Sequence, residues 1–217
     1  MTETIDNVNE ETIELSIDDL EAILGQGGTQ ENINIAEMLE TEMVNKRVLY
    51  LNGEVTDESI NYMIQLINLW NKDDYGLDVN SRIPIEIHIQ SGGGDLYASL
   101  QLVSAVESSI TPIHTFAYGM VASASYLLFV SGHVRYLSKF ATLLYHELSA
   151  NMDISTLRNM QNTVKHYEHL QNMLDEHIVD RTDIPMKKLK KKRKKNIDWY
   201  ITLEEATKYN MYDELID

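Results

Sequence analysis

Short apolar runs and longer stretches with helical periodicity follow one another along most of this chain. The first run, RVLYLNGEV at residues 47–55, alternates apolar and polar positions and indicates a strand that turns at Asn52 and Gly53. Residues 56–72 begin at a Thr56 cap and carry apolar residues three or four positions apart, which predicts a helix with one buried stripe. The residues of that stripe are Ile60, Met63, Ile64, Ile67 and Trp70.

The order of strand, glycine-rich or small-residue turn and helix then occurs twice more. The strands are IPIEIHIQ (83–90) and PIHTFAY (112–118), and the helices are DLYASLQLVSAVES (95–108) and ASASYLLFV (122–130). Such alternation is typical of βαβ units, so we expect an α/β fold with parallel strands. Two further short strands are expected around residues 134–137 and 142–146.

A long, mostly polar stretch at residues 153–182 has apolar residues every three or four positions. These residues are Leu157, Met160, Val164, Tyr167, Leu170 and Leu174. The spacing predicts an amphipathic helix that is too long for a compact core alone, so it should project or form an interface. A basic segment begins after Pro185, WYIT at residues 199–202 is strand-like, and residues 202–216 predict a capped helix followed by a final strand.

Charge divides the chain into an arm and a body. Residues 1–45 hold twelve acidic and no basic residues, out of a formal net charge of −16 for the whole chain. We expect residues 1–32 to form an acidic, flexible arm, with a short helix capped by Ser16, and residues 33–217 to form the folded domain. Eight basic residues crowd into KKLKKKRKK at residues 187–195. One basic patch on an acidic body argues against a nucleic-acid binder, because duplex binding uses a basic face across the domain.

The cysteine content and one uncharged stretch bear on the compartment of the protein and on its contact with membranes. The chain has no cysteine, which excludes a thiolate metal site and favours a reducing compartment, and we expect a cytoplasmic protein without a secretory signal. Residues 108–134 carry no Asp, Glu, Lys or Arg, but Pro112, two histidines and several Ser and Thr interrupt them. We therefore expect a buried strand and helix there, not a membrane span.

Two glycine-rich or small-residue turns are the candidates for chemistry. IHIQSGGGDL (87–96) and AYGMVASAS (117–125) each run from a strand into a helix, so two helix N-termini should face one crevice at the carboxyl ends of parallel strands. A serine there lies among oriented amides that can stabilise an oxyanion, although serine in such a turn is more often a cap or packing residue. A serine nucleophile also needs a base and a group that orients the base. His146, at the end of an apolar strand, and Asp198, just before another strand, are the candidates.

In their order and content, these segments resemble the proteolytic subunit of the Clp protease, a family of serine peptidases with the crotonase-type spiral of βαβ units. The resemblance covers about residues 47–217 and rests on RVLYLNGEV, IHIQSGGG, GMVASASYLL, LLYHELS and DWYITLEEATKYNMYDELID. It implies a ClpP-like peptidase domain with a protruding long-helix handle at about residues 147–182.

The resemblance also implies roles for individual residues. Ser123 matches the nucleophile, His146 the general base and Asp198 the acid that orients the base. The backbone N–H groups of Gly94 and Ala124 match the oxyanion hole. An extended substrate would pair beside the glycine loop, at Gly92, Gly93 and Asp95. Neither a metal nor a nucleotide cofactor is implied.

The family further implies a homo-oligomer of heptameric rings, which can stack as a tetradecamer and cleave unfolded proteins or peptides delivered by an AAA+ unfoldase. The chain departs from the family at Gly92, where proline is common, and at Glu147, which follows the histidine. Glu86 and His88 stand where the family has tyrosines that receive the unfoldase. These departures leave open a catalytically silent ring subunit that partners an active paralogue, and the fold leaves open an acyl-CoA enzyme of the crotonase type.

Overall fold

A computed structural model of the chain describes residues 35–149 and 156–217. The helix expected at Ser16 lies outside the described residues. The chain divides into two compact units, residues 1–40 and 41–217. Of the first unit, the structure describes the beginning of helix α2 (Ile35–Asn45). The second unit contains the sheet and the other described helices.

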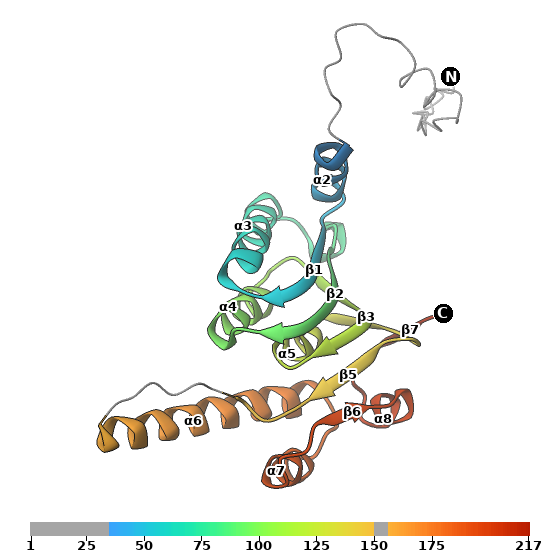
Figure 1. The fold of residues 1–217 in the computed structure, drawn as a ribbon. Helices are drawn as coiled ribbons and strands as arrows, with labels where there is room; N and C mark the ends of the chain where they lie inside the picture. Colours follow the sequence, from blue (N-terminus) through green and yellow to red (C-terminus); the bar gives the residue numbers. More distant parts are fainter. Residues whose placement is uncertain (1–34, 150–155) are drawn as a thin grey trace, which may run out of the picture. The chain divides into compact units, whose positions relative to one another are not determined.

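A seven-stranded, mostly parallel sheet organises the second unit (Figure 1). The strands are β1 (Val48–Val55), β2 (Ile85–Gly94), β3 (Ile113–Ala122), β4 (Val134–Ser138), β5 (Thr142–Tyr145), β6 (Trp199–Ile201) and β7 (Glu214–Ile216). Their order is β1-β2-β3-β4-β7, and β5 pairs with the carboxyl end of β3 and, antiparallel, with β6. The expected α/β fold with parallel strands is therefore confirmed.

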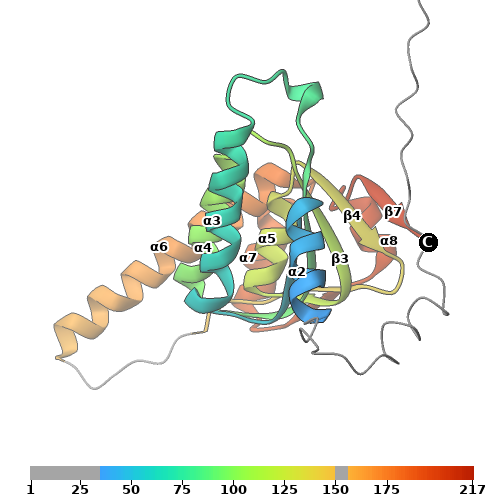
Figure 2. The same cartoon turned by 90° about the horizontal axis from the view of Figure 1, so that it is seen from above.

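Helices α3, α4 and α5 lie on one face of this sheet (Figure 2). The helices of the second unit are α3 (Asp57–Asp73), the 3-10 turn η1 (Val79–Ser81), α4 (Leu96–Glu107), α5 (Ala124–Ser131), α6 (Leu157–Arg181), α7 (Met186–Lys194) and α8 (Leu203–Lys208). Thr56 caps α3 with a reciprocal capping box to Ser59, as the sequence predicts for this cap. Leu66 joins the buried stripe of α3, whereas Ile64 is only half-buried.

The core lies between the helices and the inward side chains of the central strands. Ile85, Ile87 and Ile89 alternate along β2 and are fully buried. The uncharged stretch at residues 108–134 forms β3 and α5, and seven of the eight α5 residues are buried. In the described part of the chain, no helix combines the length and apolarity needed to cross a membrane.

The turn predicted at Asn52 and Gly53 was wrong. Residues 48–55 form one continuous strand, and its register against β2 shifts between Asn52 and Glu54. Gly53 has φ +94°, so the glycine supplies a β-bulge in place of a chain reversal. The bulge lets β1 stay paired with β2 as far as Gly94.

Helix α6 has its buried side chains in the carboxyl-terminal part of its length. Its buried residues are Leu170, Gln171, Asp175 and Ile178. Leu157 is 74% exposed and Val164 is 45% exposed, although both lie in the predicted apolar stripe. The first turns of α6 extend past the sheet in Figure 1, as expected of a projecting helix.

A bidentate ion pair joins the start of β1 to the end of α3. Arg47 Nη1 and Nη2 donate to the two carboxylate oxygens of Asp74 at 2.6 and 2.9 Å, and Thr111 Oγ1 donates to Asp74 at 2.7 Å. The hydrogen bond from Arg47 holds the pKa of Asp74 below its usual range, against the opposing effect of burial.

We expect Asp74→Asn to lower the free energy of unfolding by about 3 kcal/mol at pH 7, because it leaves the Arg47 charge buried and unpaired. The Asp74 carboxylate contributes this stability above its unfolded pKa of about 4, and the contribution is lost as the pH falls through the folded pKa. Urea unfolding at pH 7 and pH 3 measures the difference. A gap between wild type and variant that does not narrow at pH 3 would contradict the assignment.

Candidate active site

The turn from β3 into α5 holds Ser123 in an unusual backbone conformation. Ser123 has φ +57° and ψ −122°, and it is the N-cap residue of α5. A non-glycine residue at positive φ costs on the order of 1–3 kcal/mol and persists where its surroundings impose it. The Ser123 N–H donates to the carbonyl of Leu144 on β5 at 3.0 Å, which fixes the turn to the neighbouring strand.

The glycine loop at the end of β2 packs directly behind this turn. Gly93 has φ +95°, and a Cβ atom there would lie 2.7 Å from the Ser123 Cβ and 3.0 Å from the Ala124 nitrogen. Real Cβ atoms do not approach other atoms so closely. Gly94, also at positive φ, lies against the backbone of Val55. The loop therefore needs glycine at both positions, for space as well as conformation.

Residues 117–132 hold three serines, and the two besides Ser123 have structural roles. Ser125 is fully buried, and its hydroxyl accepts from the Ala122 N–H and has the carbonyls of Ser91 and Ala122 within hydrogen-bonding distance as acceptors for its one proton. Ser131 is buried and donates to the Leu127 carbonyl. Ser123 alone of the three lines a cavity, and it is half-buried.

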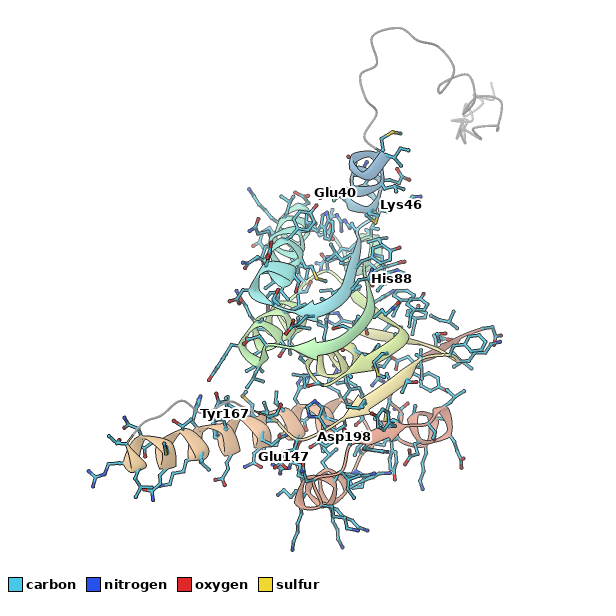
Figure 3. The ribbon with its side chains drawn as sticks, in the orientation of Figure 1. Glu40, Lys46, His88, Glu147, Tyr167 and Asp198 are labelled. Atoms are coloured by element: carbon cyan, nitrogen blue, oxygen red, sulfur yellow. The ribbon has the colours of Figure 1, made fainter. Side chains whose placement is uncertain are left out.

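That cavity has a volume of about 270 Å³ and brings most of the predicted site residues together. The predicted residues that line it are Gly94, Asp95, Ser123, Ala124 and His146. Gly92, Gly93 and Asp198 do not line it. The remaining lining is largely apolar or aromatic and includes Tyr167 of α6, which is labelled in Figure 3.

His146 contacts its own neighbour in the chain. Its Nδ1 lies 2.6 Å from the carbonyl oxygen of Glu147. A carbonyl can only accept, so Nδ1 carries the proton and the neutral ring leaves Nε2 free to accept one. This is the tautomer that a general base requires. Among the described residues, the Ser123 hydroxyl makes no hydrogen bond, so Ser123 and His146 share the cavity without being linked.

Asp198 immediately precedes β6. The antiparallel β5–β6 ladder pairs Tyr145 with Trp199, so its next position sets His146 opposite Asp198. The Asp198 side chain is exposed, and within the described residues it makes no hydrogen bond or ion pair. The register thus brings Asp198 beside the histidine segment, while no hydrogen bond among the described residues joins its carboxylate to the ring.

Two helix N-termini border the cavity, as expected. Ala124 is the first residue of α5, so its N–H has no acceptor within the helix. Asp95 caps α4, and its Oδ1 accepts from the Ala98 N–H at 2.8 Å. The pairing of β2 with β3 ends at Ser91, whereas its pairing with β1 continues to Gly94. Residues 92–94 therefore have a strand neighbour on one side only.

Four residues near the cavity were not found from the sequence. Tyr145 and Gln171 line it, and behind them Asp175 is fully buried and pairs with Arg193 of α7 at 3.1 Å. Burial raises the pKa of Asp175, and burial together with the bond to Asp175 raises the pKa of Tyr145. Asp175 lies one residue after Leu174 and four after Gln171, so its place on the buried face of the predicted helix was the available signal.

Two histidines of α6 bond to side chains of other helices. His166 lies 3.0 Å from the Tyr97 hydroxyl, and His177 lies 2.8 Å from the Ser131 hydroxyl. In the part of the chain that the structure describes, no group of three His, Asp or Glu residues could hold a metal ion.

The sheet face opposite α3 and α4 carries a row of rings. His88 stacks on Phe116 at a centroid distance of 4.5 Å, and Phe116 stacks on Tyr136 at 4.4 Å. Tyr50 lies on the other side of His88 at 5.0 Å, and Glu86 Oε2 lies 3.0 Å from His88 Nε2. Figure 3 shows His88 on this face. The histidine and the carboxylate are therefore inserted into a face that is otherwise aromatic.

Known proteins match this chain along most of its length. The sequence matches the family described as Clp protease over residues 29–217. It is 22% identical to the ATP-dependent Clp protease proteolytic subunit 1 of Prochlorococcus marinus (strain NATL2A), over 82% of this chain and 87% of that protein. It is 23% identical to the ATP-dependent Clp protease proteolytic subunit of Deinococcus radiodurans, over 82% of this chain and 83% of that protein.

The chain therefore belongs to the Clp protease family, as its motifs indicated. The low identity marks a divergent member. The parallel sheet and the helices that cover it are consistent with the fold of this family.

We expect Gly93→Ala to lower the free energy of unfolding by at least about 2 kcal/mol, because the new methyl group would overlap Ser123 at a positive φ. Gly92→Ala is the matched control, since nothing lies within 4 Å of a Cβ there and φ is not positive, and it should change stability by less than about 1 kcal/mol. Urea unfolding compares the two variants. Equal losses would show that the loop does not press on the serine turn.

Proposed function

We propose that this protein is a Clp-type serine endopeptidase in which Ser123 is the nucleophile, His146 the general base and Asp198 the residue that orients the base. The observation that carries the proposal is the strained Ser123 turn, which opens into the same cavity as His146 and the two helix N-termini. Family membership supports the same reaction.

In the proposed reaction, Ser123 Oγ attacks a peptide carbonyl and its proton passes to His146 Nε2. The N–H groups of Gly94 and Ala124 donate to the oxyanion that forms. His146 then gives its proton to the leaving amine, and water releases the acyl group by the reverse transfers. The Nδ1–H bond to the Glu147 carbonyl supports this sequence, because it leaves Nε2 free to accept the proton.

The proposed substrate is an unfolded protein or a peptide in extended conformation. Residues 92–94 have an open side along which a substrate strand could pair, which supports Gly92, Gly93 and Asp95 as its contacts. The apolar and aromatic lining of the cavity favours an apolar side chain next to the cleaved bond.

The proposed assembly is a heptameric ring, with stacking through α6 and delivery of substrate by an AAA+ unfoldase. The exposed apolar residues Leu157 and Val164 on the projecting part of α6 support an interface there. The aromatic row supports a docking face, which Glu86 and His88 make more polar than an apolar pocket. We propose a dedicated partner for this reason.

A fluorophosphonate probe tests the activity directly. We expect the purified full chain to form a single adduct on Ser123, and His146→Ala to slow its formation at least about a thousandfold because the proton acceptor is lost. Ser104→Ala, which removes an exposed hydroxyl on α4, is the control and should label at the wild-type rate. Peptide mass spectrometry identifies the labelled residue. An adduct elsewhere, or one that His146→Ala leaves unchanged, would contradict the proposed roles.

The unlinked Ser123 and His146 favour a second candidate function, a catalytically silent ring subunit that supports an active paralogue. In that case the probe forms no adduct under conditions in which an active family member is labelled. A crotonase-type acyl-CoA enzyme is the third alternative, and it predicts thioester chemistry that survives Ser123→Ala.

The role of Asp198 has its own test. We expect Asp198→Asn to slow probe labelling at least about a hundredfold, because an amide holds the imidazole less well in the required tautomer and does not stabilise the imidazolium. Asp183→Asn is the matched control, since Asp183 is an exposed carboxylate that does not line the cavity. Rates of adduct formation are read by intact mass. Labelling of Asp198→Asn at the wild-type rate would mean that the Glu147 carbonyl alone orients His146.

A further inference from the structure

A buried polar cluster lies directly behind the histidine segment, on the side of α6. Tyr145 is 3% exposed, Gln171 is 4% exposed and Asp175 is fully buried. The Tyr145 hydroxyl donates to Asp175 Oδ1 at 2.7 Å, and Gln171 Nε2 donates to the same oxygen at 3.0 Å. One carboxylate oxygen therefore accepts hydrogen bonds from a hydroxyl on β5 and from a side-chain amide on its own helix.

Gln171 extends this cluster to the other side of His146. Its Oε1 accepts from the Leu148 N–H at 2.7 Å. The segment that carries His146 is thus held at Tyr145, one residue before the histidine, and at Leu148, two residues after it. Both attachments lead to Asp175, whereas among the described residues the His146 ring itself bonds only to the adjacent Glu147 carbonyl. The position of the ring consequently depends on where α6 holds the backbone of residues 145–148.

The charge of Asp175 is compensated from α7. Arg193 Nε lies 3.1 Å from Asp175 Oδ2, and the Arg193 side chain is 15% exposed. A second guanidinium nitrogen of Arg193 donates to Asn172 Oδ1 at 3.2 Å. A buried carboxylate is unfavourable unless it is paired and hydrogen-bonded, and an apolar contact would join the two helices without that cost. Burial of the Asp175 carboxylate has a structural reason if its directed hydrogen bonds fix the position of the segment that carries His146.

We infer that Asp175 is a positioning residue for the peptidase reaction, acting through the hydrogen bonds of Tyr145 and Gln171 to hold the His146 segment against Ser123. This inference rests on the proposed function and adds residues to its site. Asp175 touches neither substrate nor the reacting atoms. It acts on the rate of acyl transfer through the backbone on which the base is carried.

Tyr145→Phe tests the inference because it removes one hydroxyl and retains the ring. We expect probe labelling of Ser123 to slow about tenfold, with the KM for a peptide substrate nearly unchanged. Unfolding in urea should remain cooperative, at a lower midpoint because the buried Asp175 carboxylate loses one hydrogen bond. Tyr212→Phe is the matched control, since it removes a tyrosine hydroxyl that bonds Thr207 and does not line the cavity. It should label within about twofold of the wild-type rate. Wild-type labelling by Tyr145→Phe would overturn the inference.

A conservative double variant separates the hydrogen bond from the charge. Asp175→Asn combined with Arg193→Gln removes both buried charges and keeps an oxygen that can accept from Tyr145. We expect this variant to label within about threefold of the wild-type rate. A loss as large as that of Tyr145→Phe, in a variant that still unfolds cooperatively, would show that the hydrogen bonds are not what positions the segment.

Hydrogen exchange gives a measurement that does not depend on activity. In the wild-type chain the Leu148 amide should be protected by Gln171, and Tyr145→Phe should speed exchange of the peptide containing residues 145–149 while Tyr212→Phe does not. If the wild-type chain is not labelled by the probe, the proposed function fails. Hydrogen exchange alone then tests whether Tyr145 and Gln171 hold the segment that carries His146. Unchanged exchange in Tyr145→Phe then overturns the positioning role, and faster exchange supports it.

Discussion

The close packing of the glycine loop against the serine turn is the constraint on which the rest of the site depends. Gly93 and Ser123 both have positive φ, and there is no room for a side chain between them. The contact exists only because β2 and β3 are adjacent parallel strands that end at the same edge. The Ser123 amide is bonded in turn to Leu144 of β5, the strand that leads to His146. One junction therefore sets the relative positions of the serine, the glycine loop and the histidine segment.

The helices that follow β5 hold the histidine segment in place from behind the cavity. Helix α6 contributes a fully buried carboxylate, and α7 contributes the arginine that compensates it. Directed hydrogen bonds from this cluster reach both sides of the histidine, which apolar packing could not do because dispersion contacts have little directional preference. The basic segment that contains Arg193 is thus more than a solvated helix face: Arg193 and Lys188 both make contacts inside the domain.

Family membership and catalytic competence make different demands on this chain. A fold survives at 22 to 24% identity because a core tolerates many apolar substitutions as long as volume and pattern are kept. Acyl transfer needs reacting groups placed to within a fraction of an ångström. The strained serine, the Ala124 N–H at the start of α5 and the histidine tautomer meet part of that demand. Ser123, His146 and Asp198 are not joined by hydrogen bonds among the described residues. The proposed peptidase and the alternative silent subunit differ in whether these three side chains become joined by hydrogen bonds.

The sequence by itself determined the elements and their order, because caps, alternation and helical periodicity are properties of short segments. The Thr56 and Thr202 caps and the parallel βαβ units could be read in this way, and the family resemblance pointed to Ser123 and His146. Only the tertiary structure decided that Gly53 makes a bulge, since a glycine turns or bulges according to the strand beside it. It also decided that Asp175 is buried while Asp198 is exposed, because the environment of Asp175 is set by Tyr145 of β5 and Arg193 of α7, which are not its neighbours in the sequence.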